Sequence, residues 1–311
     1  MIAVAAVASL NYSGAEQIPG TIRIWGTPQM QTVVDRWANN FDAIHPSVRV
    51  LPKLLGTETG MAGLYTGIAD VAVMGRRATP KEIMGFEWVF KYKPVEIAIL
   101  TGSLDVPGKA PALAVFVHQD NPVSQLTLAQ VDAIFSCERL RGLTAIESWA
   151  QVGLRGAWAH EKVHAYGFDT ETGSASFFKT VVMNGSGKWN WPHLHEFKDA
   201  QQILDTLARD PAGIAVSNLC YTNPHVKPVA LSREQGAQFY LPTRESLITQ
   251  SYPLTRLAYA YVNRPPGKPM STLILEFLKY VLSEAGQQEA IEGGYLPLNA
   301  ISVEEQRGKL R

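Results

Sequence analysis

Val48-Arg-Val-Leu-Pro-Lys-Leu-Leu-Gly-Thr-Glu-Thr-Gly60 runs from a β-prone stretch into a Thr/Gly turn, and a helix is predicted after it at Met61–Ile68. The same turn, Thr-Glu-Thr-Gly, recurs at Thr170–Gly173, between the β-prone stretch Val163–Phe168 and a second predicted helix, Ser174–Met183. The first turn of a helix has backbone N–H groups without intrahelical partners, and the helix dipole favours negative charge there. Threonine hydroxyls beside these groups add neutral donors. The repeated strand–turn–helix pattern therefore predicts one anion-binding turn in each half of the chain.

A third turn of this kind comes first in the chain. Thr21–Trp25 alternates like a strand, and Gly26-Thr27-Pro28 follows it. Thr27 suits the N-cap position, and Pro28 the first helical position, of a helix predicted to continue over Met30–Ile44. We therefore expect Thr27 at the carboxyl end of a strand, where open α/β sheets bind ligands. Each of these threonines, taken alone, is also typical of an ordinary helix cap.

Strands and helices alternate along the rest of the chain, which is typical of an α/β fold with mostly parallel sheets. The further predicted strands are Val71–Met74, Val95–Leu100, Leu113–His118, Ile214–Ser217 and Ala258–Val262. The further predicted helices are Pro80–Phe86, Leu128–Phe135, Asp199–Arg209 and Met270–Ala285. Gly293, Gly294 and Pro297 are expected to stop helix formation at the C-terminus.

The chain is long enough for two lobes, and two segments suit the crossings between them. The first crossing is expected near Pro107–Pro111, and the second before or within Tyr252–Val262. We therefore predict lobe 1 over residues 16–113 and 255–311, and lobe 2 over residues 114–254. Two hinge strands would join these lobes and allow them to close around a ligand.

The charge balance argues against a nucleic-acid-binding protein. Lys and Arg together number 28, Asp and Glu also number 28, and the formal net charge is zero. Residues 1–10 are small and apolar, and Ser13-Gly14-Ala15 then provides small residues for a cleavage after Ala15. Residues 1–15 are therefore typical of a secretory signal peptide and its cleavage site. No later segment is long and apolar enough to span a membrane. We expect an exported protein, periplasmic or secreted, that acts as a monomer.

Patterns for catalysis or metal binding are weak. Ser176-Phe-Phe-Lys179 matches a short motif of penicillin-binding enzymes, but its partner motifs are missing. His193 and His195 alternate in a way that a metal site could use, but no cysteine is near them. The sequence therefore predicts a non-enzymatic protein without metal or cofactor. Cys137 and Cys220 are expected as separate, mostly buried thiols, although export would permit a disulfide.

Several stretches together resemble the phosphate-binding periplasmic proteins, which are the substrate-binding subunits of ABC-type phosphate importers. These stretches are Asp70–Arg77, Leu126–Phe135, Tyr252–Arg256, Tyr261–Gly267, Glu276–Ser283 and Gly294–Leu298, the last two being the most specific. The resemblance runs from about Thr21 to Asn299. It implies a type II periplasmic-binding-protein fold, with two α/β lobes and a ligand cleft between them. It also implies phosphate or another small oxyanion as ligand, and a membrane permease with its ATPase as partners.

The resemblance also implies which residues contact the ligand, because the family binds phosphate through loop N–H groups and hydroxyls of both lobes. Thr27 and the turn Thr57–Gly60 match the loops of the first lobe. Thr172, Gly173 and Ser174 match the Ser-Gly-Thr portion of the loop in the second lobe. The expected ligand contacts are Thr27, Thr57, Thr59, Gly60, Arg76, Thr172, Gly173 and Ser174.

Three positions depart from the family pattern. Phe168 stands where the phosphate-binding arginine is expected, and Thr170 where an Asp is expected. Gly75 stands where some members carry an acid that accepts the phosphate proton. Arg76 or Arg77 is then expected to supply the positive charge, and Glu58 or Glu171 to take over from the acid. The departures leave open an organic ligand stacked on Phe168, or a ligand-free sensory or interaction module. A hydrolase on the same fold is disfavoured, because no activated nucleophile is present.

Overall fold

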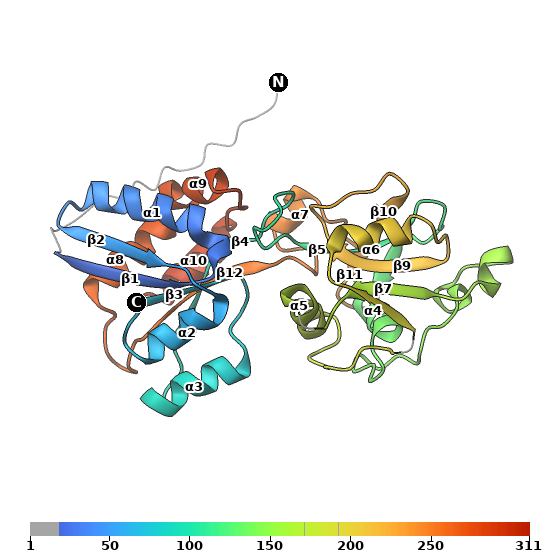
Figure 1. The fold of residues 1–311 in the computed structure, drawn as a ribbon, viewed down its shortest axis with the longest axis horizontal. Coiled ribbons are helices and arrows are strands. Elements are labelled where there is room, and N and C mark those ends of the chain that lie inside the picture. Colours follow the sequence, from blue (N-terminus) through green and yellow to red (C-terminus); the bar gives the residue numbers. More distant parts are fainter. Residues whose placement is uncertain (1–18, 171, 192) are drawn as a thin grey trace, which may run out of the picture. The chain divides into compact units, whose positions relative to one another are not determined.

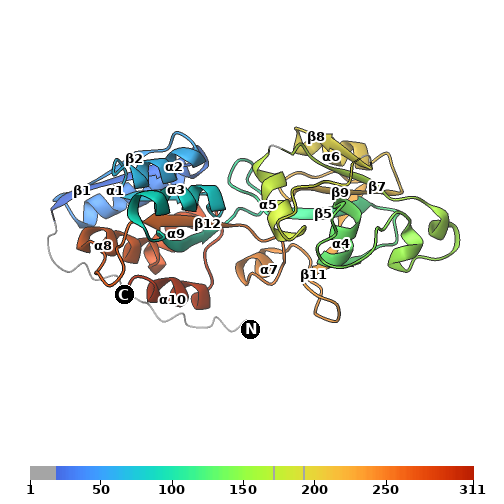
Figure 2. The same cartoon turned by 90° about the horizontal axis from the view of Figure 1, so that it is seen from below.

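Two α/β units make up the described part of the chain, residues 19–170, 172–191 and 193–311 of a computed structural model (Figures 1 and 2). The first unit holds the residues up to Gly102 together with Gly108–Ala110 and Leu257–Arg311, and the second holds Ser103–Pro107 and Pro111–Arg256. The signal peptide predicted over residues 1–15 and the candidate Glu171 lie outside the described residues.

The first unit is built on a five-stranded sheet with the order β2-β1-β3-β12-β4. Its strands are β1 (Gly20–Gly26), β2 (Val48–Lys53), β3 (Val71–Met74), β4 (Val95–Thr101) and β12 (Leu257–Val262). β1 pairs in parallel with β2 and β3, whereas β12 is antiparallel to β3 and β4. Because β1, β2 and β3 run in the same direction, the three predicted ligand loops that follow them begin at one edge of the sheet.

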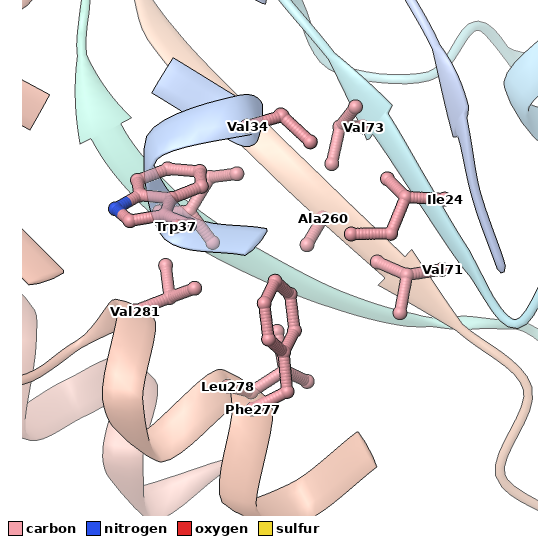
Figure 3. A pocket seen from close by; sticks show the side chains of 10 residues that line it. Ile24, Val34, Trp37, Val71, Val73, Ala260, Phe277, Leu278 and Val281 are labelled. Carbon is pink, nitrogen blue, oxygen red and sulfur yellow. The ribbon is translucent and has the colours of Figure 1, made fainter. Parts of the chain in front are cut away.

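Helices pack on this sheet and fill its core with apolar side chains. They are α1 (Gln31–Ile44), α2 (Thr57–Tyr65), α3 (Pro80–Phe90), α8 (Thr272–Val281), α9 (Glu284–Glu292) and α10 (Ala300–Gly308), with a 3-10 turn, η1 (Pro28–Met30), before α1. Trp37 of α1 and Phe277 of α8 face Ile24 and Val71 of the sheet (Figure 3). The space that these side chains line has no room for a water molecule, so it belongs to the packed core.

The second unit has its own five-stranded sheet, with the order β10-β5-β9-β7-β8, and a separate two-stranded sheet of β11 and β6. Its strands are β5 (Leu113–His118), β6 (Gln125–Thr127), β7 (His164–Phe168), β8 (Leu194–Phe197), β9 (Gly213–Asn218), β10 (Val226–Pro228) and β11 (Ala230–Ser232). Its helices are α4 (Leu128–Phe135), α5 (Gly173–Val181), α6 (Ala200–Leu207) and α7 (Arg244–Ile248), with the 3-10 turns η2 (Trp149–Val152) and η3 (Gly156–His160).

The α/β class and the two-lobed fold are confirmed, but the prediction of mostly parallel sheets is wrong. β7 is parallel to β8 and β9, whereas β5 is antiparallel to both β9 and β10, so both large sheets are mixed. β5 begins shortly after the chain enters the second unit, and β12 begins where the chain returns to the first. A strand that arrives from another unit needs no helical crossover within its own sheet, so nothing constrains it to be parallel.

The helix predictions are right in place but wrong in several bounds. Helix α2 begins at Thr57, four residues before the prediction, so the Thr-Glu-Thr-Gly turn forms the first turn of the helix itself. The predicted helix Met270–Ala285 is divided into α8 and α9, because Ser283 Oγ caps the Gly286 N–H at 3.2 Å and starts a new helix. A helix also follows Pro297: α10 begins where Asn299 Oδ1 accepts the Ser302 N–H at 2.8 Å.

Two general expectations can be compared with the described residues. Cys137 and Cys220 are free thiols, and both are half-buried rather than mostly buried. Burial raises the pKa of Cys220 to about 11. No helix within residues 19–311, apart from the two undescribed positions, has the length and apolar character to cross a membrane.

Candidate anion-binding loops

The loop after β1 carries Thr27 at a buried position. The Thr27 N–H donates to Val73 O at 3.1 Å, and the residue is 4% exposed. Thr27 is the N-cap residue of the short turn η1, and Pro28 occupies the first helical position as predicted. However, the Thr27 side chain makes no cap hydrogen bond. The hydroxyl of Thr27 therefore does not serve the helix, unlike the hydroxyl of an ordinary cap.

The loop after β2 is held against the loop after β1. The Gly56 N–H donates to Gly26 O at 3.0 Å, and Gly56 is the N-cap of α2, which makes Thr57 its first residue. Thr59 Oγ1 donates to Gly56 O at 2.7 Å, inside the same turn. Gly60 serves packing, because a Cβ there would lie 3.3 Å from both the Cα of Gly26 and the Trp25 carbonyl oxygen. The two loops thus lie together at the carboxyl ends of β1 and β2.

The loop after β3 brings Gly75 beside this edge. A Cβ at Gly75 would lie 3.9 Å from Thr27 Cγ2 and 3.4 Å from Gln29 Oε1. The same position would lie 3.6 Å from the Cβ of Ala110, so a segment distant in sequence also reaches this loop. Thr27, Gly60 and Gly75 are therefore close together in the first unit, as the sequence predicts for its three loops.

The positive charge of Arg76 is already paired with a carboxylate. Its Nη1 and Nη2 atoms donate to the two carboxylate oxygens of Glu82 at 2.8 and 3.0 Å. Burial works against the charge of Arg76, but Glu82 and then Glu58 outweigh it, so the pKa of Arg76 is raised. Arg77 Nε lies 3.0 Å from Glu96 Oε1, and the guanidinium carbon of Arg77 lies 5.3 Å from the ring centroid of Tyr259. Both candidate arginines are thus paired with carboxylates in the structure.

Lys109 is a further basic residue at this edge, and no sequence motif marks it. Its Nζ donates to Thr32 Oγ1, in the first turn of α1, at 2.9 Å. Burial lowers the pKa of Lys109. The only sequence signal is its position in the segment Pro107–Pro111, which was expected to hold a crossing.

The loop after β7 forms a capped helix start in the second unit. Thr172 is the N-cap of α5, and its Oγ1 accepts the Ala175 N–H at 3.1 Å and donates to Asp169 O at 3.0 Å. Gly173 and Ser174 are the first two residues of the helix. Ser174 Oγ donates to Asn218 Oδ1, at the carboxyl end of β9, at 3.2 Å. Thr172, Gly173 and Ser174 are therefore brought together, with Asn218 as an unpredicted neighbour.

Phe168 is the last residue of β7 and is 3% exposed, so its ring is buried within the second unit. Arg256, 82 residues from Ser174 in sequence, places its Nη1 atom 3.5 Å from Ser174 Oγ. In the sequence, Arg256 belongs only to the family-like stretch Tyr252–Arg256, and no neighbouring residue indicates that it reaches α5.

Among the described residues, no group of three or more His, Cys, Asp or Glu side chains is arranged to hold a metal ion. His195 lies on β8, where its ring stacks on Tyr166 at a centroid distance of 5.5 Å. This histidine therefore packs on a neighbouring strand.

Comparison with known proteins agrees with this architecture. A model of the PBP superfamily domain matches residues 12–285. The phosphate-binding protein PstS of Pseudomonas aeruginosa is 33% identical over 304 residues, which cover 96% of this chain and 91% of that protein. The chain belongs to the family of PstS phosphate-binding proteins. Members of the PstS family are substrate-binding proteins, so this chain is a binding protein and not an enzyme.

Solved structures of the PstS family have the same fold. PstS from Borrelia burgdorferi has a TM-score of 0.65 at 18% identity, over 90% of this chain and 100% of that one. An ABC-type phosphate transport receptor from Vibrio cholerae has a TM-score of 0.61 at 19% identity, over 89% and 99% of the two chains. These likenesses support the two-lobed α/β fold of the binding-protein family.

Proposed function

We propose that this chain is an exported receptor that binds phosphate and delivers it to an ABC importer. The observation that carries this proposal is the 33% identity to the PstS protein of Pseudomonas aeruginosa over 96% of the chain. The partners would be a membrane permease and its ATPase, and the receptor would act as a monomer. Export to the periplasm or the exterior belongs to the same proposal.

The loops support an anion as the ligand. In the first unit, Thr27 and Thr57 stand where a strand ends and a helical turn begins. In the second unit, Gly173 and Ser174 occupy the first turn of α5. Backbone N–H groups at such positions lack intrahelical partners and lie at the positive end of the helix dipole. Donors in each unit are proposed to contribute to binding, together with Thr59, Gly60 and Thr172 of the same turns.

Arg76 remains in the proposed set in a modified role. Its guanidinium has five N–H groups, and Glu82 and the Arg77 carbonyl accept from the two Nη atoms. The remaining N–H groups can bind an oxyanion while Glu82 balances the charge. The affinity of this loop for a dianion then depends on the charge of Glu82 as well as on that of Arg76.

Calorimetric titration of the ligand-stripped protein with phosphate tests the proposal. Sulfate, arsenate, molybdate and a small organic phosphate serve as competitors, and thermal unfolding of the same samples shows whether the folded state binds. Selective binding of phosphate is the expected result. Absence of any phosphate heat and of any thermal shift would contradict the receptor function.

A ligand-altered sensory or interaction module is the second candidate. It is favoured by the departures from the family pattern, because Phe168 is buried and the guanidinium of Arg76 is engaged by Glu82. Binding of an organic anion without binding of phosphate in the same titrations would support this second function.

A further inference from the structure

Helix α5 has an arginine at each end. Arg141 Nε and Nη2 donate to the carbonyl oxygens of Val182 and Val181 at 2.5 and 2.7 Å, at the C-terminal end of the helix. Arg256 Nη1 lies 3.5 Å from Ser174 Oγ, at the N-terminal end. The helix dipole favours a cation at the C-terminal end and opposes one at the N-terminal end. Arg141 is thus placed as a stabilising cap, whereas the position of Arg256 is electrostatically unfavourable toward the helix.

Arg256 is also buried. The residue is 8% exposed, and its guanidinium carbon lies 5.2 Å from the ring centroid of Phe177. Removing a charge from water is costly, and the helix dipole adds to that cost here. An anion at this end of α5 interacts favourably with both the guanidinium and the dipole, so it would offset both costs.

The surrounding polar groups suit an oxyanion. Thr172 Oγ1 caps the Ala175 N–H, and the Ser176 N–H bonds to Thr172 O at 3.0 Å. Gly173 and Ser174 are therefore the first-turn residues whose N–H groups this cap does not take up. Asn218 accepts from Ser174 Oγ through Oδ1, which leaves its amide N–H₂ group as a further donor. Donors from α5, β9 and Arg256 thus converge on one helix end.

We propose that Arg256 is the phosphate-binding cation of the second unit, in the place of the family arginine that is replaced by Phe168. The assignment rests on the proposed function and specifies it further. A phenylalanine carries no charge, so position 168 cannot supply the positive charge of the family arginine. A guanidinium fork matches the geometry of phosphate oxygens, and it stays charged at every physiological pH.

The test compares phosphate titrations of the wild-type chain with Arg256→Gln, Arg256→Lys and Arg141→Gln. Loss of a charge-assisted contact is expected to raise the Kd of Arg256→Gln by roughly 10- to 100-fold. Arg256→Lys keeps the charge but loses the fork, so an intermediate Kd is expected. Arg141→Gln removes the arginine at the other end of the same helix. It is the matched control, expected to lower Tm while leaving Kd within about twofold.

A measurement on the wild-type chain keeps the test independent of how the variants fold. The side-chain Nε–H signal of Arg256 in a ¹H–¹⁵N spectrum, assigned by its loss in Arg256→Lys, is expected to shift on saturation with phosphate. Phosphate binding with an unmoved Arg256 signal, or with unchanged affinity in folded Arg256→Gln, would overturn the assignment. A wild-type chain that binds no phosphate would instead contradict the proposed function.

Discussion

Arg76 and Glu82 form a two-point ion pair directly after β3, with Nη1–Oε2 at 2.8 Å and Nη2–Oε1 at 3.0 Å. The same carboxylate accepts the Thr79 N–H at 2.7 Å, while Thr79 Oγ1 accepts the Glu82 N–H, which completes a capping box at the start of α3. Glu82 therefore takes part in the cap of α3 and also balances the charge of Arg76 beside the candidate anion loop. This double role connects the stability of α3 to the charge of the loop.

Glu82→Gln is expected to tighten phosphate binding and weaken the fold. The substitution leaves the charge of Arg76 unbalanced, and the added attraction is expected to lower Kd by roughly three- to tenfold. Loss of the ion pair and weakening of the cap are expected to reduce the free energy of unfolding by about 1–2 kcal/mol. Calorimetric titration and urea unfolding measure the two effects.

Gln130→Ala supplies the control for this prediction. Thr127 and Gln130 form a capping box at the start of α4 that includes no ion pair. This variant is expected to lose about 1 kcal/mol of stability with unchanged phosphate affinity. Equal phosphate affinities in Glu82→Gln and the wild-type chain would show that Arg76 does not interact with the ligand.

The ion pair also predicts a pH dependence of stability. Burial acts to raise the pKa of Glu82, but Arg76 and the Thr79 N–H outweigh it and hold that pKa below its ordinary value of 4.5. A depressed folded-state pKa contributes stability above the unfolded value and loses it as pH falls through the folded value. The free energy of unfolding should therefore fall below pH 4.5 more steeply in the wild-type chain than in Glu82→Gln. Urea unfolding of both proteins at a series of pH values from about 3 to 6 tests this expectation. The same pH dependence of the free energy of unfolding in both proteins would disprove it.

Local patterns were sufficient to find the strands and loops that carry the candidate site. The Thr/Gly turns at Thr57 and Thr172 combine strong β-formers, a cap residue and a helix within a dozen residues, so neighbouring residues alone determine them. The capping box of Thr79 and Glu82 has the same local origin. The antiparallel pairing of β12 with β3 has no such signal, because it depends on the path of the chain between the units.

Contacts between distant segments could not be predicted in this way. Arg256 reaches Ser174 across 82 residues, and Lys109 reaches Thr32 across 77. The short strands β8, β10 and β11 also lack a clear alternation of apolar and polar residues, and they are defined by partners elsewhere in the sheets. The sequence therefore identified the loops, whereas the fold was needed to show which basic residues reach them.

Thr172→Ala is expected to weaken both the second-unit helix start and ligand binding. It removes the oxygen that accepts the Ala175 N–H, which typically costs about 1 kcal/mol of stability. It also disturbs the donors of the adjoining turn, and we expect a roughly tenfold rise in the Kd for phosphate. Asp199→Ala is the matched control, because Asp199 caps α6 of the same unit through the Gln202 N–H at 2.9 Å. Identical phosphate affinities in the two variants would remove Thr172 from the proposed site.

Gly60→Ala tests whether this glycine serves packing between α2 and β1. Its added Cβ would lie 3.3 Å from both the Cα of Gly26 and the Trp25 carbonyl oxygen, and backbone atoms cannot swing aside as a flexible side chain does. We expect a loss of about 1–3 kcal/mol in the free energy of unfolding, measured by urea. Gly85→Ala in α3 is the control, because its Cβ would meet only Tyr65 at 3.5 Å, an ordinary contact. Alanine is the better helix former, so this control is expected to gain about 0.5–1 kcal/mol. A stabilised Gly60→Ala would mean that α2 can move away from β1, and that close packing between them does not require a glycine at this position.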